Sequence, residues 1–159
     1  EEAWKSIFPD KGTIHASEWH WGGATLSKWK NAPLDKKWSE LLEIRAEVLK
    51  ALESKRSSNE IGSSLEASVS LYSSKKEFAG FLRDNADCLP ALFISSQVEI
   101  ADSSPHESVK CANLPLHISI VKAKGRKCAR CWNFREDVET DKELGDICAR
   151  CAKVVRDRR

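Results

Sequence analysis

Hydrophobic and polar positions repeat with two different periods along the chain. From Asp35 to about residue 57, apolar side chains recur at steps of three and four, which is typical of one face of an α-helix. These side chains are Trp38, Leu41, Leu42, Val48, Leu49 and Leu52. Asp35 is the expected N-cap, and Arg45 is expected to extend from the apolar face to solvent, unless it meets a carboxylate or phosphate. The pattern predicts one long amphipathic helix.

The second period begins at Leu65, where apolar and polar residues alternate as far as Tyr72 and predict a half-buried strand. Residues 74–77 (SKKE) match a capping box and predict a short helix. Its inward side chains are expected to be Phe78, Phe81 and Leu82. Further strand is expected at residues 92–94, 98–100 and 116–120. The middle of the chain is therefore predicted to be a small α/β domain.

The first part of the chain, residues 1–32, reads as the end of a helix followed by a loop. Trp4, Ile7 and Phe8 form an apolar face that ends at Pro9. Alternating Trp19 and Trp21 could stack on nucleic-acid bases, but packing in a core or at a domain boundary is the simpler interpretation. The chain of 159 residues contains no methionine, so we expect it to be part of a longer protein.

Two pairs of cysteines carry the strongest chemical signal. Each has the sequence Cys-Ala-Arg-Cys, at residues 128–131 and 148–151. The separation between the two pairs falls within the range expected for a zinc ribbon. The predicted ligands are Cys128, Cys131, Cys148 and Cys151. Four thiolates fill the coordination shell of one zinc ion, so the site would be structural.

Iron in a rubredoxin-like site is the chemical alternative. Charged residues surround both pairs, whereas such iron sites usually lie in a richer apolar shell, so zinc is favoured. Of the remaining cysteines, Cys88 is expected in a core and Cys111 in a loop. We assign neither of them a reactive role.

Several residues near the cysteines could contact a polyanion. Arg130 lies inside the first pair and Trp132 follows it directly, where both could face an unpaired base or a phosphate. Trp132 could equally pack beneath its own turn. Downstream, a possible set of phosphate contacts comprises Arg150, Lys153, Arg156, Arg158 and Arg159.

The charge distribution is compatible with this interpretation without requiring it. From Lys122 onward there are 12 Lys and Arg against 7 Asp and Glu, whereas the preceding residues carry 14 against 17. A solvated surface could have the same composition. No glycine-rich phosphate loop or catalytic constellation is evident, so we assign no catalytic residues.

Three sequence blocks resemble the C-terminal end of isoleucyl-tRNA synthetase of the bacterial and organellar type. They are residues 38–48 (WSELLEIRAEV), residues 61–67 (IGSSLEA), and residues 127–132 (KCARCW) together with 147–151 (ICARC). The resemblance covers essentially the whole chain. It implies an α+β fold with the end of a helical anticodon-binding domain at 1–58, a small α/β junction domain at 59–122 and a zinc-binding tail at 123–159.

The resemblance also implies a function. The parent enzyme, an aminoacyl-tRNA synthetase, joins isoleucine to tRNA(Ile) with ATP, using catalytic and editing domains that lie upstream in the same chain. This region would bind tRNA and would not bind ATP, with Arg130 and Trp132 matching positions that contact an unstacked anticodon base. No membrane partner is expected. The protein would work in the cytoplasm if bacterial, or in a chloroplast or mitochondrion if eukaryotic.

A free-standing zinc ribbon that binds another RNA or a protein is the alternative function. Without the first two blocks, the cysteine pairs would fit either function equally well. The synthetase interpretation accounts for all three blocks in their order and is therefore preferred.

Overall fold

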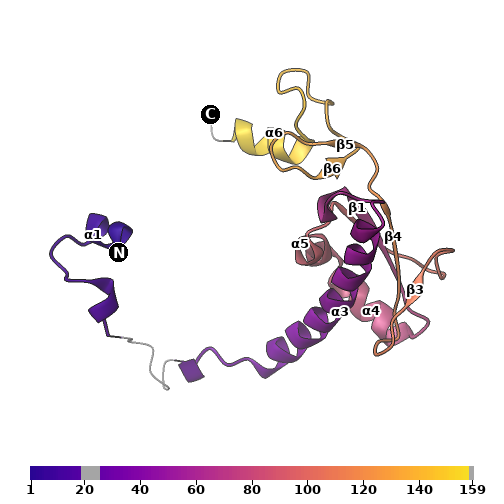
Figure 1. The fold of residues 1–159 in the computed structure, drawn as a ribbon, viewed down its shortest axis with the longest axis horizontal. Coiled ribbons are helices and arrows are strands. Elements are labelled where there is room, and N and C mark those ends of the chain that lie inside the picture. The colour runs from indigo at the N-terminus through magenta and orange to yellow at the C-terminus, as the bar shows by residue number, and fades with distance from the viewer. Residues whose placement is uncertain (19–25, 158–159) are drawn as a thin grey trace. The chain divides into compact units, whose positions relative to one another are not determined.

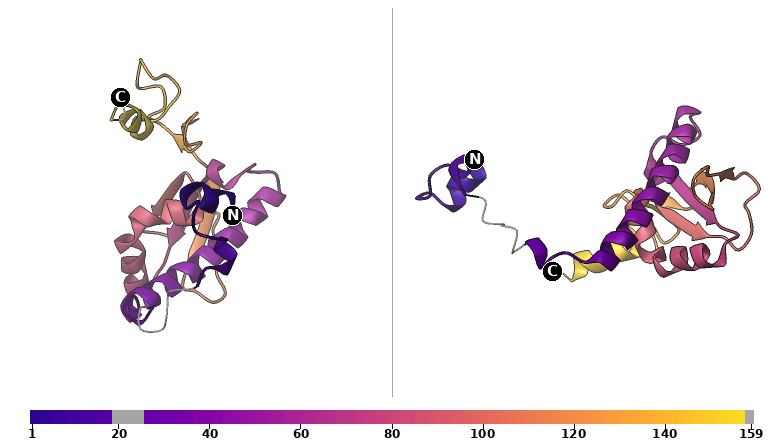
Figure 2. Two further views of the ribbon diagram at one scale, coloured as in Figure 1. Left: turned by 90° about the vertical axis from the view of Figure 1, so that its left-hand side faces the viewer. Right: turned by 90° about the horizontal axis from the view of Figure 1, so that it is seen from below.

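The computed structural model describes residues 1–18 and 26–157, which form two compact units, Glu1–Ser39 and Glu40–Arg159 (Figures 1 and 2). In the first unit, helix α1 (Glu2–Ile7) is followed by a 3-10 turn (Ile14–Ala16). The Trp4 indole N–H donates to the carbonyls of Lys11 and Gly12, at 3.0 and 3.1 Å. The predicted helix end is confirmed, whereas Trp19 and Trp21 lie outside the described residues.

Helix α3 (Ala32–Ser57) confirms the long helix, but its start corrects the predicted cap. The backbone N–H of Leu34 donates to Asn31 Oδ1 at 3.1 Å, so Asn31 caps the helix and Asp35 lies in the first turn. Pro33 is tolerated here because the first helical residues have no intrahelical partner for their N–H groups.

The buried face of α3 also differs from the prediction. It consists of Leu41, Ile44, Val48 and Leu52. Leu42 and Trp38 are 53% and 43% exposed. At about 100° per residue, Leu42 lies well around the helix from Leu41, whereas Trp38 precedes Leu41, the first buried residue of the helix. Arg45 donates from Nε to the backbone carbonyl of Leu92 at 3.0 Å, so it is tied to a neighbouring segment and its partner is a carbonyl group.

A four-stranded sheet in the order β2-β1-β4-β3 forms the centre of the second unit. The strands are β1 (Ala67–Tyr72), β2 (Gln97–Ile100), β3 (Val109–Lys110) and β4 (His117–Lys122). Strand β1 pairs parallel with β2 and antiparallel with β4, where Val69 lies opposite Ile120. Alternate residues of β1 are buried, as the period of two predicts. The short edge strand β3 was not expected.

The segment between β1 and β2 is a crossover, as parallel pairing requires. It contains α4 (Lys76–Asp84), a 3-10 turn (Ala86–Cys88) and α5 (Leu89–Phe93). The predicted strand at 92–94 is therefore wrong: Leu92 and Phe93 belong to α5, which has Pro90 in its first turn and ends at Ile94 in a left-handed conformation. Helix α4 is confirmed without its capping box, since Lys75 occupies the N-cap with no side-chain bond.

Helix α3 and the crossover share one hydrophobic core with the sheet. This core includes Leu41 and Val48 from α3, Leu82 and Phe93 from the crossover, and Val69 from β1. Cys111 is buried in it although its segment is a loop, whereas Cys88 is half-buried against it. Among residues 1–18 and 26–157, no helix is both long and apolar enough to cross a bilayer.

Candidate metal centre and nucleic-acid interface

Two different local structures present the cysteine pairs. The first pair lies in the turn between β5 (Arg126–Lys127) and β6 (Phe134–Arg135), which are antiparallel. Cys148 and Cys151 lie at the start of α6 (Ala149–Arg156), with Cys148 as its N-cap. A hydrogen bond of 3.0 Å from the Ala129 N–H to the Asp146 carbonyl joins the two segments. We call residues 123–157, which contain both pairs, the finger.

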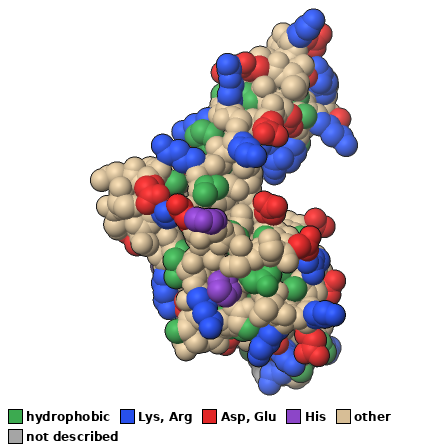
Figure 3. Space-filling model, turned by 90° about the vertical axis from the view of Figure 1, so that its right-hand side faces the viewer, with side chains coloured by type: hydrophobic (Ala, Val, Ile, Leu, Met, Phe, Trp, Pro, Cys, Tyr) green, Lys and Arg blue, Asp and Glu red, His purple; other side chains and the backbone are tan. Residues whose placement is uncertain are grey.

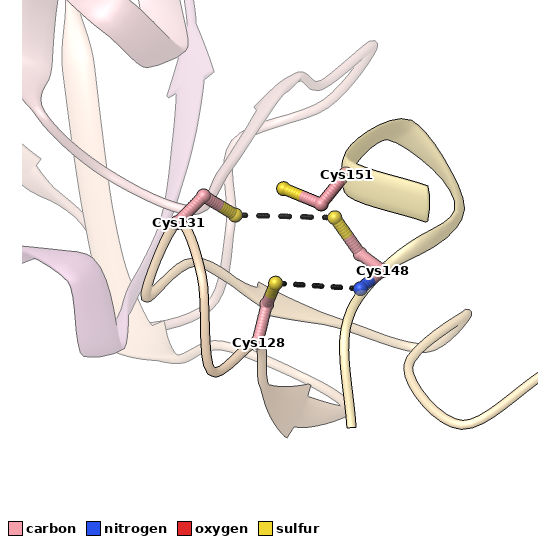
Figure 4. Close-up of side chains that lie close together, drawn as sticks. All are labelled: Cys128, Cys131, Cys148 and Cys151. Carbon is pink, nitrogen blue, oxygen red and sulfur yellow. Dashed lines mark hydrogen bonds between the residues drawn. The ribbon is translucent and has the colours of Figure 1, made fainter. Parts of the chain in front are cut away.

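The four sulfurs converge on one point (Figure 4). Their Sγ atoms all lie within 4.8 Å of one another, and those of Cys131 and Cys148 are 3.9 Å apart. A tetrahedral zinc site with Zn–S bonds of about 2.3 Å places its sulfurs about 3.8 Å apart. All six cysteines of the chain are free of disulfides. The donor set and its spacing therefore fit a structural zinc ion.

The closeness of the four sulfurs changes the pKa values of their thiols. Burial raises the pKa of the Cys148 thiol to about 12, and hydrogen bonds with the neighbouring sulfurs add to this effect. Burial also raises the pKa of Cys131, but hydrogen bonds with Asn133 and with the sulfurs of Cys128 and Cys151 together outweigh it and lower this pKa to about 6. A bound divalent cation would stabilise the thiolate form of all four cysteines, because only deprotonated thiols act as metal ligands.

Helix α6 was not expected from the sequence, although it orients half of the ligands. The Ala149 N–H in its first turn donates to Asp137 Oδ2 at 3.2 Å. A carboxylate here satisfies a free helical N–H and complements the positive end of the helix dipole. Asp137 is therefore part of the site's support. The sequence gives little indication of this role, because Asp137 lies well before α6 in the chain and outside both cysteine pairs.

Trp132 lies on the outside of the first turn. Its side chain is 61% exposed, which contradicts packing beneath the turn. The residue has φ of 64°, a left-handed conformation that is rare for a bulky side chain. The ammonium of Lys127 lies 5.6 Å from the centre of the indole ring. The turn thus presents a flat aromatic ring beside a cation.

The two arginines inside the cysteine pairs are exposed but also contact sulfur. Arg130 donates from Nη1 to Cys151 Sγ at 3.6 Å, across to the other pair. A hydrogen bond with the Cys131 sulfur raises the pKa of Arg150. Four thiolates around one zinc ion would carry a net charge of −2, and both guanidinium groups would offset part of that charge.

The remaining predicted contacts lie on α6. Lys153 is exposed on this helix, one turn beyond Arg150. Arg156 forms ion pairs with Asp141 at 2.5 Å and with Glu143 at 3.6 Å. Arg156 is thus already paired within the finger, which the sequence pattern did not indicate. Arg158 and Arg159 lie outside the described residues.

Gly125 permits the close approach of two backbones at the base of the finger. Its φ is +89°, and a Cβ atom there would lie 2.3 Å from the carbonyl carbon and oxygen of Arg135. We expect Gly125→Ala to lower the stability of the finger by at least about 1–3 kcal/mol, the range for a strained backbone conformation alone. Thermal unfolding of the zinc-loaded chain, followed by NMR signals of the finger, measures this loss.

Gly145→Ala is the matched control for that substitution. Gly145 also has a positive φ, of 61°, but no described atom lies within 4 Å of the position where a Cβ would be. It therefore carries the conformational cost without the collision. Equal losses in the two variants would show that the backbone contact at Gly125 is unimportant.

Comparisons with known proteins agree with this site. Residues 125–154 match the family model described as the zinc finger found in FPG and IleRS. The chain is 38% identical over 148 residues to the isoleucine–tRNA ligase of Gloeothece citriformis, with 84% of this chain and 15% of that protein covered. The Desulforamulus reducens ligase is 40% identical over 132 residues (82% and 14% covered), and that of Shewanella pealeana 31% over 139 residues (86% and 15% covered).

The fold and the site define a four-cysteine zinc finger joined to a small α/β domain. The finger is of the type that the matching family model describes. Within this class, the chain belongs to the isoleucine–tRNA ligase family, as a C-terminal segment. It spans 14–15% of the length of the relatives reported above.

Proposed function

We propose that this chain is the tRNA-binding C-terminal region of an isoleucine–tRNA ligase. Its role would be to position tRNA(Ile) for ATP-dependent aminoacylation by catalytic domains upstream in the same chain. The observation that carries the proposal is the exposed indole of Trp132, on a turn that the four-cysteine cluster closes. An exposed aromatic ring on a rigid turn is a suitable stacking surface for an unpaired anticodon base.

The surroundings of Trp132 support an RNA partner. Lys127 lies over its ring, and Arg130 and Arg150 are exposed nearby in the two cysteine pairs. Figure 3 shows Lys and Arg side chains over the finger, in the upper part of the view, interspersed with Asp and Glu side chains. Cations around an aromatic platform are the combination that binds single-stranded nucleic acid. We therefore assign one structural zinc ion to the finger and the RNA contact to the residues that it holds outward.

Salt dependence tests the phosphate contacts. We expect the affinity of the chain for an isoleucine tRNA to fall as salt increases, because RNA binding releases condensed counterions. Lys153→Ala should reduce the slope of log K against log salt by about 1. Fluorescence titrations at several salt concentrations measure both quantities.

Arg156→Ala is the matched comparison on the same helix. Because Arg156 pairs with Asp141 and Glu143, it should change the slope less than Lys153→Ala. A parent affinity that does not respond to salt would contradict the phosphate contacts and would favour a protein partner instead.

The enzymatic role belongs to the parent protein and is part of the proposal. No catalytic residue is assigned in this chain, and ATP would bind upstream. The compartment would follow the source, with a bacterial enzyme in the cytoplasm and a eukaryotic one in a chloroplast or mitochondrion.

A further inference from the structure

The finger contacts the α/β domain at the start of β2 and, where the chain leaves β4, through a hydrogen bond of 2.7 Å from the Ala123 N–H to the Glu66 carbonyl. Its own hydrophobic cluster, made of Cys128, Val138, Cys148 and Cys151, is separate from the core around the sheet. In Figure 3 the two parts meet across a narrow neck. Because no buried apolar cluster of the described residues spans both parts, their relative orientation depends on polar contacts at this neck.

Ser96 makes the first of these contacts. It is 7% exposed, and its hydroxyl donates to the Leu65 carbonyl at 2.5 Å. The same oxygen accepts from the backbone N–H of Phe134, the first residue of β6, at 2.7 Å. One buried hydroxyl thus bridges the segment before β1 and the hairpin that carries the first cysteine pair.

Gln97 makes the second contact. Its side-chain Nε2 donates to the Lys124 carbonyl at 2.9 Å, while Lys124 N–H donates to Oε1 at 3.1 Å. Lys124 lies in the link between β4 and β5, through which the chain enters the finger. The Gln97 amide therefore bonds to both the N–H and the carbonyl of Lys124, as an adjacent β-strand would. This pairing fixes the direction in which the backbone of Lys124 runs.

We propose that Ser96 and Gln97 form a latch that holds the finger in one orientation relative to the α/β domain and thereby positions Trp132. The two residues act through the backbone of Lys124 and Phe134 and are positioning residues. The consequence for RNA rests on the proposed function, whereas the orientation itself does not.

Backbone ¹⁵N relaxation of the zinc-loaded chain tests the latch directly. In the parent, we expect the finger and the α/β domain to share one rotational correlation time. In a variant with both Ser96→Ala and Gln97→Ala, the finger should tumble faster than the domain while it retains one zinc ion. A common correlation time in that variant would overturn the proposal.

Two further variants make the result specific. Gln97→Ala alone leaves the buried Ser96 in place and should give an intermediate effect, which guards against general unfolding of the double variant. Glu99→Ala changes an exposed residue on the same strand and should leave the common correlation time intact. If the finger of the Glu99→Ala variant tumbled as fast as that of the double variant, the proposal would also be wrong.

Titration with an isoleucine tRNA tests the functional consequence. The double variant should bind about 3- to 10-fold more weakly, since a mobile finger must be ordered on binding, and its salt slope should not change. Unchanged affinity despite independent tumbling would overturn the positioning role. If the parent itself failed to bind, the proposed function would be wrong while the relaxation result would still decide the latch.

Discussion

Removal of zinc from the chain is expected to unfold residues 123–157 while the α/β domain stays folded. The reason is the size of the finger core, in which the buried side chains are three cysteines and Val138, with Cys131 and Ile147 packed against them. Such a core cannot offset the conformational entropy that the finger loses when it folds. Structural zinc in small fingers contributes roughly 10–16 kcal/mol of apparent binding free energy, so its loss removes most of the stability.

The measurement is an NMR spectrum of the chain before and after treatment with a strong chelator. Signals from the finger should collapse to the narrow range of an unfolded chain, whereas those of β1 and β4 should keep their dispersion. Adding back zinc should restore the finger. Metal analysis should confirm that the treated chain is free of zinc. If the finger signals then remained dispersed, a structural metal site would be contradicted.

Replacement of Trp132 by alanine is expected to weaken binding of an isoleucine tRNA by about 1–3 kcal/mol, or about 5- to 150-fold. The side chain makes no contribution to the buried clusters of the finger, being 61% exposed, so the loss should reflect the missing stacking surface. Fluorescence or filter-binding titrations of the two zinc-loaded proteins measure the difference.

Trp132→Phe is the control, because it retains an aromatic face at the same left-handed position. It should recover a large part of the lost affinity, and both variants should bind one zinc ion per chain. Equal affinities of the parent and Trp132→Ala would count against stacking. A loss of zinc in Trp132→Ala would assign the residue a structural role instead.

Features set by local spacing could be predicted from the sequence. The two Cys-Ala-Arg-Cys segments specify four ligands whatever the surrounding fold, and the structure brings their sulfurs together. Strand β1 could be predicted equally well, because apolar and polar residues alternate along the whole strand. In α3 the period predicted the helix, whereas Trp38 and Leu42 show that an apolar residue near the face need not be buried.

Features that depend on distant partners could not be predicted. The apolar run at residues 92–94 is compatible with either a strand or a buried helix. It is helical because it lies in the crossover between the parallel strands β1 and β2. Arg130 and Arg156 read as exposed cations, but their partners Cys151 and Asp141 lie far from them along the chain. The bridge through Ser96 joins segments that are even further apart in the sequence, and no local pattern marks it.

The central claim is that the finger holds an RNA-binding surface directed at the anticodon. Its most direct test is titration of the zinc-loaded chain with an isoleucine tRNA and with the same tRNA carrying a different anticodon. We predict measurable binding that is stronger for the isoleucine anticodon and that is lost when zinc is removed. Equal binding of both tRNAs, unaffected by zinc removal, would contradict the claim.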